Sequence, residues 1–106
     1  MTPAPRRGEI WLAELDKIRP VIVMTRDPMG RLLNAVLVAP VTSTVRGIST
    51  EVLVGAPDGI RRPSVANVDN LQLLARDRLV RQVGRARSST MSSLCAALSI
   101  AVDCGQ

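Results

Sequence analysis

The hydrophobic residues of this chain fall into short runs separated by turn-forming residues, a pattern that predicts a protein built from short strands. Residues 9–15 alternate roughly between apolar and polar side chains, as a half-buried strand does. A continuous apolar run follows Pro20 at 21–24, and a second one at 35–39 ends at Pro40. Because proline is tolerated at the first residue of a strand, we expect the first two strands to form a hairpin.

Turn signals divide the middle of the chain into further short segments. We expect turns at Asp27–Gly30 and Ala56–Gly59, and a loop over the hydroxyl-rich stretch 42–50. The remaining predictions are strands at 51–54, 64–68, 71–74 and 80–83, a bend at 69–70, a short helical turn at 77–79 and a strand exit at Gly84.

The last segment has a helical period, with apolar residues every three or four positions from Ser88, a candidate N-cap, to a predicted end near Gly105. The predicted apolar face consists of Met91, Leu94, Cys95, Leu98 and Val102. Five or six short antiparallel strands followed by one helix favour a small, strongly bent sheet or barrel with the C-terminal helix packed on it. We expect one domain over residues 1–106, with the Pro-rich residues 1–6 as a flexible tail.

Composition narrows the range of partners and chemistries. The chain has 14 Lys and Arg against 9 Asp and Glu, and its net charge of +5 favours a polyanion such as nucleic acid, although a GC-rich coding sequence would also enrich arginine. It has no histidine, which excludes His-based ribonucleases, Ser-His-Asp hydrolases and His-ligated metal sites. Trp11 is the only aromatic residue, so an aromatic platform for stacking bases is excluded.

The two cysteines, Cys95 and Cys104, indicate neither a zinc site nor a disulfide framework, and this favours a reducing cytoplasm. The N-terminus lacks the apolar core of a signal peptide, and no run approaches the roughly 20 apolar residues that a membrane span requires. We therefore expect a soluble, cytoplasmic protein that uses no metal, cofactor or membrane.

Two polar side chains lie where buried strands are predicted to begin or end. Arg19 precedes Pro20 at the start of one strand, and Thr42 follows Pro40 at the end of the next. A guanidinium and a hydroxyl can both donate hydrogen bonds to phosphate oxygens, so the pair suggests an RNA-cleaving site. Both residues also fit ordinary roles, Arg19 as a solvated charge beside a hydrophobic strand and Thr42 as a turn residue. Glu9, near the start of the first strand, is interpreted as an edge charge.

Five segments in order along the chain resemble the MazF/PemK toxin family. They are Arg7–Trp11, Arg19–Val23, Val38–Ser43, Ser64–Asp69, and Arg78–Leu79 together with Val83–Gly84. The resemblance implies an SH3-like antiparallel barrel of the MazF/PemK/CcdB type, a homodimer, and metal-independent, sequence-selective cleavage of single-stranded RNA. It also implies a bacterial type II toxin–antitoxin system, in which a cognate antitoxin places an acidic, disordered tail in the RNA groove.

The resemblance places the family's catalytic residues at Arg19 and Thr42, and Asp69 where some members carry an acid proposed to assist proton transfer. We expect the RNA-binding residues to be Lys17, Ser43, Thr44, Arg46, Asn67 and Asn70. In RNA the 2′-hydroxyl can attack its adjacent phosphate, so the enzyme must align this attack and stabilise the additional negative charge rather than supply a nucleophile. The expected products carry a 2′,3′-cyclic phosphate and a 5′-hydroxyl.

The chain departs from the family pattern in two places. Only residues 15–18 separate the first strand from Arg19, where many members have a long loop, and we expect the short link to widen the groove and alter base recognition. Asn67 stands where some members have a basic residue, so no Arg/Asp pair forms with Asp69. The alternative function is a non-catalytic module of the same fold that binds RNA or, like CcdB, targets gyrase, because fold alone does not determine function.

Overall fold

The computed structural model describes residues 4–102. Its strands are β1 (Glu9–Glu14), β2 (Ile18–Val23), β3 (Ala35–Thr42), β4 (Glu51–Val54), β5 (Ser64–Asn67), β6 (Gln72–Ala75) and β7 (Leu79–Arg85). Its helices are α1 (Met29–Leu32), α2 (Ser88–Val102) and the 3-10 helices η1 (Ala56–Asp58), η2 (Val68–Asn70) and η3 (Arg76–Arg78). The predicted class, mainly β with a C-terminal helix, is confirmed, while α1 forms where the sequence pattern predicts only a turn.

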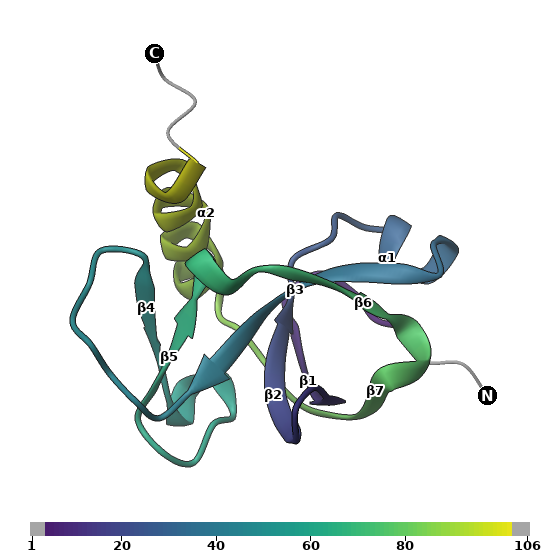
Figure 1. Cartoon of the computed structure of the whole chain (residues 1–106), viewed down its shortest axis with the longest axis horizontal. Helices are drawn as coiled ribbons and strands as arrows, with labels where there is room; N and C mark the ends of the chain where they lie inside the picture. The colour runs from purple at the N-terminus through teal and green to yellow at the C-terminus, as the bar shows by residue number, and fades with distance from the viewer. Residues whose placement is uncertain (1–3, 103–106) are drawn as a thin grey trace.

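The strands form one strongly bent antiparallel sheet in the order β4-β5-β3-β2-β1-β7, with β6 also paired to β3. β3 is the central strand, and Figure 1 shows it crossing the middle of the molecule. Its first half pairs with β6 and its last residues pair with β5, because Val38 lies opposite Gln72 and Val41 lies opposite Ala66. The connection between β5 and β6, which contains η2, therefore follows β3 along its length.

The central strands are buried on both faces, which explains their continuous apolar sequences. Val21 and Val38 belong to one apolar cluster, whereas their chain neighbours Ile22 and Ala39 belong to another. Because successive side chains of a strand point to opposite faces, each run supplies both clusters. The larger cluster also receives Leu94 from α2, so the helix covers one face of the sheet.

Pro40 lies inside β3, whereas the sequence pattern placed the end of that strand at this residue. It pairs with Val21 of β2, and β3 continues to Thr42. On the other side of β3, the paired residues are 35–38 with β6 and 41–42 with β5, so Pro40 falls in the gap between these two partners. A proline without an N–H is tolerated at such a position because no ladder hydrogen bond is lost there.

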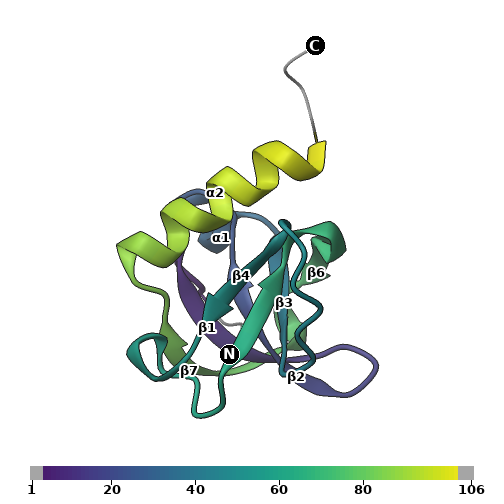
Figure 2. The same ribbon diagram turned by 90° about the vertical axis from the view of Figure 1, so that its left-hand side faces the viewer.

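The buried side of α2 differs from the predicted face. Thr90, Leu94 and Ala97 are buried, while Cys95 and Val102 of the predicted face are exposed. The helix contacts β4 and η2, and its far end extends past the strands, as Figure 2 shows. The predicted end near Gly105 lies outside the described residues, and within those residues no helix is both long and apolar enough to span a membrane.

The start of α2 is held by a residue about thirty positions earlier in the chain. The helix begins at Ser88, so the capping position is Arg87, whose side chain has no acceptor atom. The buried Asp58 supplies the acceptor: its Oδ1 receives hydrogen bonds from the Arg87 amide at 2.9 Å and the Thr90 hydroxyl at 2.9 Å. Asp58 therefore ties η1 to the first turn of α2.

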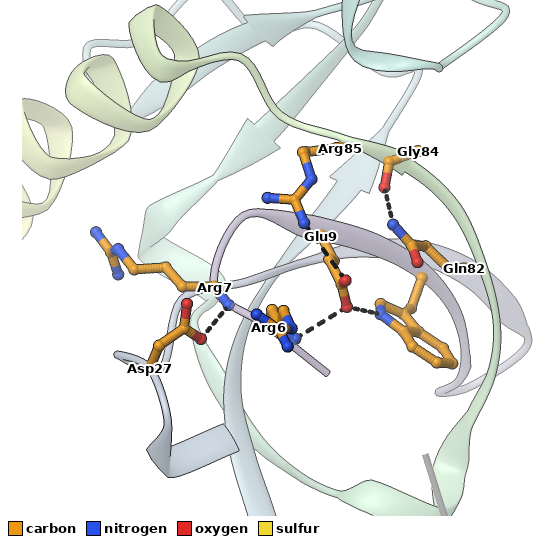
Figure 3. Close-up of polar contacts among 8 residues, drawn as sticks. Arg6, Arg7, Glu9, Asp27, Gln82, Gly84 and Arg85 are labelled. Atoms are coloured by element: carbon orange, nitrogen blue, oxygen red, sulfur yellow. Dashed lines mark hydrogen bonds and ion pairs between the residues drawn. The ribbon is translucent and has the colours of Figure 1, made fainter. Parts of the chain in front are cut away.

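The segment that precedes β1 packs against the sheet rather than extending from it, and the Gly8 amide donates to the Val23 carbonyl at 2.9 Å. Residues 1–3 of the expected tail lie outside the described residues, but Pro5 is fully buried. Glu9 is only 8% exposed, so its interpretation as an edge charge is wrong. Its Oε1 accepts hydrogen bonds from the Arg6 amide at 2.9 Å and Trp11 Nε1 at 3.0 Å, and its Oε2 pairs with Arg85 Nη2 at 3.6 Å (Figure 3).

Candidate active-site cleft

A cleft of about 1010 Å³ lies where the β1–β2 link, the end of β3 and η2 meet. All of the residues that the sequence analysis put forward as catalytic or RNA-binding line it: Lys17, Arg19, Thr42, Ser43, Thr44, Arg46, Asn67, Asp69 and Asn70. These residues lie close together because they occupy the end of β3, the ends of strands that pair with β3, and the loops beside them. The structure places the residues together, and their roles remain predictions.

Arg19 lies near the start of β2 with its side chain about one-third exposed, at 32%. Its guanidinium donates two hydrogen bonds to Asp16, from Nε to Oδ1 at 3.0 Å and from Nη2 to Oδ2 at 3.2 Å. The hydrogen bond with Arg19 lowers the pKa of Asp16, and the same bond raises the pKa of Arg19. Both groups are therefore charged throughout the neutral pH range.

Thr42 is the last residue of β3 and lies on the same side of the molecule as Arg19. The β2–β3 pairing ends at Val21 and Pro40; Arg19 precedes Val21 by two residues and Thr42 follows Pro40 by two, so both lie just past the same end of this pairing. The Thr42 hydroxyl oxygen accepts a hydrogen bond from the Thr44 amide at 3.1 Å. Its own O–H can then be donated to a ligand.

Asp69 occupies the middle of η2, and two buried neighbours hold it in place. The Thr50 hydroxyl donates to Asp69 Oδ2, and the Asp69 amide donates to Asn67 Oδ1 at 2.8 Å. Asn67 lines the cleft but is only 5% exposed, and its side-chain oxygen is engaged by the Asp69 amide, so it fixes the start of η2. Asp69 itself is exposed to the cleft.

The loop after β3 forms another wall and is closed by Glu51. The Glu51 carboxylate accepts hydrogen bonds from the Arg46 amide at 3.0 Å and the Gly47 amide at 2.9 Å. Gly47 has a φ of +77°, which a residue without a side chain adopts at little cost. The loop therefore presents the exposed Ser43, Thr44 and Arg46 side chains along the cleft.

Several residues that line the cleft were not predicted from the sequence to be functional, above all Asp16, Glu51, Gln72 and Arg78. Arg78 Nη1 donates to the Glu14 carbonyl at 3.3 Å, which holds this guanidinium beside the β1–β2 link. The sequence contains one signal for Asp16, because an acid three residues before Arg19 is close enough along the chain to form an ion pair with it. Among the described residues, no group of three or more His, Cys, Asp or Glu side chains could hold a metal ion.

Comparison with known proteins identifies the family to which this sequence and fold belong. Residues 6–102 match the model of the PemK-like, MazF-like toxin of type II toxin–antitoxin systems. The probable endoribonuclease MazF5 of Mycobacterium tuberculosis (strain ATCC 25618 / H37Rv) is 40% identical over 109 residues, covering 100% of both chains. Endoribonuclease MazF3 of the same strain is 44% identical over 94 residues, covering 89% of this chain and 91% of its own.

Solved structures agree with the sequence comparison. The Mycobacterium tuberculosis toxin MazF-mt6 has a TM-score of 0.86 at 43% identity, covering 90% of this chain and 96% of its own. An endoribonuclease solved in complex with its cognate antitoxin, from a mycobacterial species, has a TM-score of 0.88 at 28% identity, covering 97% and 99%. The small bent sheet with its C-terminal helix is thus a MazF-like toxin fold. The chain belongs to the PemK-like, MazF-like toxin family of type II toxin–antitoxin systems.

Proposed function

We propose that this protein is the toxin of a bacterial type II toxin–antitoxin system and acts as a metal-independent endoribonuclease on single-stranded RNA. The observation that carries the proposal is that Arg19, Thr42 and Asp69, from three separate segments, line one cleft. Relatives at 40% and 44% identity that match most of the chain are named as endoribonucleases. Both facts support a nuclease built on these residues.

The proposed reaction is an internal phosphoryl transfer within the RNA. The 2′-oxygen forms a bond to the adjacent phosphorus while the bond from phosphorus to the 5′-oxygen breaks. The proton of the 2′-hydroxyl passes to a base, for which Asp69 is the candidate, and the departing 5′-oxygen takes a proton from water. The products are a 2′,3′-cyclic phosphate and a 5′-hydroxyl.

Arg19 and Thr42 would act on the charge that accumulates at phosphorus. Arg19 remains protonated, since its pKa lies above its already high ordinary value, so it stabilises charge rather than giving up a proton. The O–H of Thr42 would donate one further hydrogen bond to a phosphate oxygen. Donors held in place before the reaction stabilise a developing oxyanion without reorganising during it.

The proposed partners follow from the family and from the charge of the chain. We expect a cognate antitoxin whose acidic tail competes with RNA for the cleft, a homodimeric toxin, and a bacterial cytoplasmic location. The net charge of +5 is suited to both an acidic peptide and RNA.

Cleavage of labelled single-stranded RNA in the presence of EDTA tests the proposal. The wild-type protein should generate fragments with 2′,3′-cyclic phosphate and 5′-hydroxyl ends. Arg19→Ala should abolish cleavage while its circular dichroism spectrum and sedimentation match the wild type. RNA that is bound but left intact would instead indicate the non-catalytic binding module, and an active Arg19→Ala variant would remove Arg19 from the mechanism.

A further inference from the structure

Asp16 holds the guanidinium of Arg19 from inside the cleft. Both of its carboxylate oxygens are engaged, Oδ1 by Nε at 3.0 Å and Oδ2 by Nη2 at 3.2 Å. Asp16 comes from the β1–β2 link and lines the cleft together with Arg19. The link is tight, because the Leu15 amide donates to the Lys17 carbonyl at 3.0 Å, and Asp16 lies in this bend three residues before Arg19.

The side from which Asp16 binds determines which donors of Arg19 stay available. A guanidinium carries five N–H donors in a fixed plane, and Asp16 engages the edge formed by Nε and Nη2. The second edge, formed by Nη1 and Nη2, remains for another ligand. That edge offers two parallel N–H bonds, the arrangement that binds two oxygens of one phosphate.

Stability does not account for this pair. The side chain of Asp16 is 70% exposed and that of Arg19 is 32% exposed, and ion pairs so accessible to water contribute little to folding. The ion pair has a larger effect on the orientation of the Arg19 side chain, because this side chain has several rotatable bonds that a two-point contact immobilises.

We propose that Asp16 is a positioning residue that orients Arg19 so that its Nη1/Nη2 edge faces the scissile phosphate. This inference rests on the nuclease function proposed above. Both carboxylate oxygens of Asp16 contact Arg19, so in this role Asp16 acts through the arginine. The lowered pKa of Asp16 keeps its carboxylate charged, and the pair intact, wherever the enzyme works near neutral pH.

A different role for Asp16 makes the opposite kinetic prediction. If its negative charge only repelled RNA from the cleft, removing it would strengthen binding and leave the chemical step unchanged. If it positions Arg19, removing it weakens an interaction made mainly in the transition state, so kcat falls while KM changes little.

The test uses the full chain and an RNA oligonucleotide with a single cleavage site, chosen by sequencing 5′-hydroxyl ends from digested total RNA. Asp16→Ala should lower kcat on the order of 10- to 100-fold, as expected when a catalytic group is misplaced, with KM within about twofold of the wild type. Asp16→Glu should recover part of the rate, because it restores a carboxylate. Asp77→Ala removes the same charge from an exposed site outside the cleft and should match the wild type.

A double-variant cycle checks that the effect passes through the arginine. Lysine cannot make the paired contact, so adding Asp16→Ala to Arg19→Lys should cause much less loss than in the wild type. Equal losses in both backgrounds, or a lower KM with kcat retained, would overturn the positioning role. A fully active Asp16→Ala variant together with an inactive Arg19→Ala variant would overturn the positioning role and leave the proposed nuclease function standing. A wild-type protein that does not cleave RNA would overturn both the positioning role and the nuclease function.

Discussion

The Thr42 hydroxyl has a place in the cleft that a single substitution can test. Thr42→Ala removes one donor to the developing charge and should slow cleavage by about one to three powers of ten. The Thr44 amide also loses its acceptor at Thr42 Oγ1, but that contact is exposed and its loss should not unfold the protein.

Thr42→Ser provides the matched control, because it keeps the hydroxyl and removes only a methyl group. Single-turnover rates of both variants, measured on one oligonucleotide, should therefore separate clearly. Equal rates for Thr42→Ala and the wild type would exclude Thr42 from the reaction.

Asp69 is the candidate base, and a substitution that removes its negative charge while keeping its shape tests this role. Asp69→Asn preserves the shape of the side chain and can still accept from Thr50, but it cannot take a proton from the 2′-hydroxyl. We expect the cleavage rate to fall about 10²- to 10⁴-fold, the usual contribution of a general base. Asp77→Asn, an exposed change of the same kind outside the cleft, should retain full activity, and a similarly active Asp69→Asn would show that another group takes the proton.

At the residue scale, the sequence located the lining residues better than their contacts. Arg19 and Thr42 could be placed because hydrophobic runs and prolines mark where strands begin and end. The bonds of Asp16 to Arg19 and of Glu51 to the loop amides depend on rotamers and loop closure, which periodicity does not encode. Glu9 was misjudged for a similar reason, since its burial depends on donors brought to it by Arg6 and Arg85.

Among the elements, the junction of η1 and α2 depends on the buried Asp58. Burial alone would raise the pKa of Asp58, but hydrogen bonds from the Arg87 amide, the Thr90 hydroxyl and the Gly55 amide outweigh it, and the pKa lies below its ordinary value. A carboxylate with a lowered folded-state pKa stabilises the fold above its unfolded pKa of about 3.9. That contribution is lost as the pH falls below this value, through the folded-state pKa.

Asp58→Ala should lower the free energy of unfolding by about 2–3 kcal/mol at pH 7, because it removes a cap and leaves buried donors without an acceptor. The measurement is urea unfolding at pH 7 and at several lower values. The difference between the variant and the wild type should shrink as the pH drops below about 4. A difference that is independent of pH would contradict the role given to the Asp58 charge.

The same junction contains two glycines in close contact. A Cβ placed on Gly84 of β7 would lie 2.4 Å from the Asp58 carbonyl oxygen and 3.2 Å from the Gly59 Cα. Gly84→Ala should therefore destabilise the protein by about 1–3 kcal/mol through overpacking. Gly55→Ala, which has nothing within 4 Å of the added atom and whose φ of −167° is extended, serves as the control in thermal unfolding.

The elements themselves were largely predictable, because apolar runs and turn residues mark them. The errors arose where distant segments decide the outcome. β3 passes through Pro40 because its partners change there, and α2 buries Thr90 and Ala97 rather than Cys95 because of where it meets β4 and η2. No local pattern reports these contacts.

For the whole molecule, excess positive charge should make RNA binding sensitive to salt. The log of the affinity for an RNA analogue with a 2′-deoxy cleavage site should fall with the log of the salt concentration, by about 0.7 per phosphate contact. Arg78→Ala, inside the cleft, should make this slope shallower by about that amount. Arg61→Ala removes an exposed arginine outside the cleft and should leave the slope unchanged.

The fold class followed from the sequence, but the association of its strands did not. Short strands with a terminal helix indicated a bent sheet, and the resemblance supplied the barrel type. The pairing of β3 with β2, β5 and β6 requires contacts between residues far apart in the chain, which hydrophobic periodicity does not specify. The homodimer stays a prediction, and sedimentation that detects only monomer at micromolar concentration would contradict it.

The position of β3 has a consequence for how proteins of this kind diversify. One strand carries interior packing at Val41 and a cleft residue at Thr42, so substitutions there disturb folding and chemistry together. The loop at 43–49 borders the cleft outside the paired strands, and its residues are exposed, so it carries less of that constraint. Grafting this loop from a relative onto this framework should transfer part of the preferred nucleotide sequence and leave thermal stability nearly unchanged.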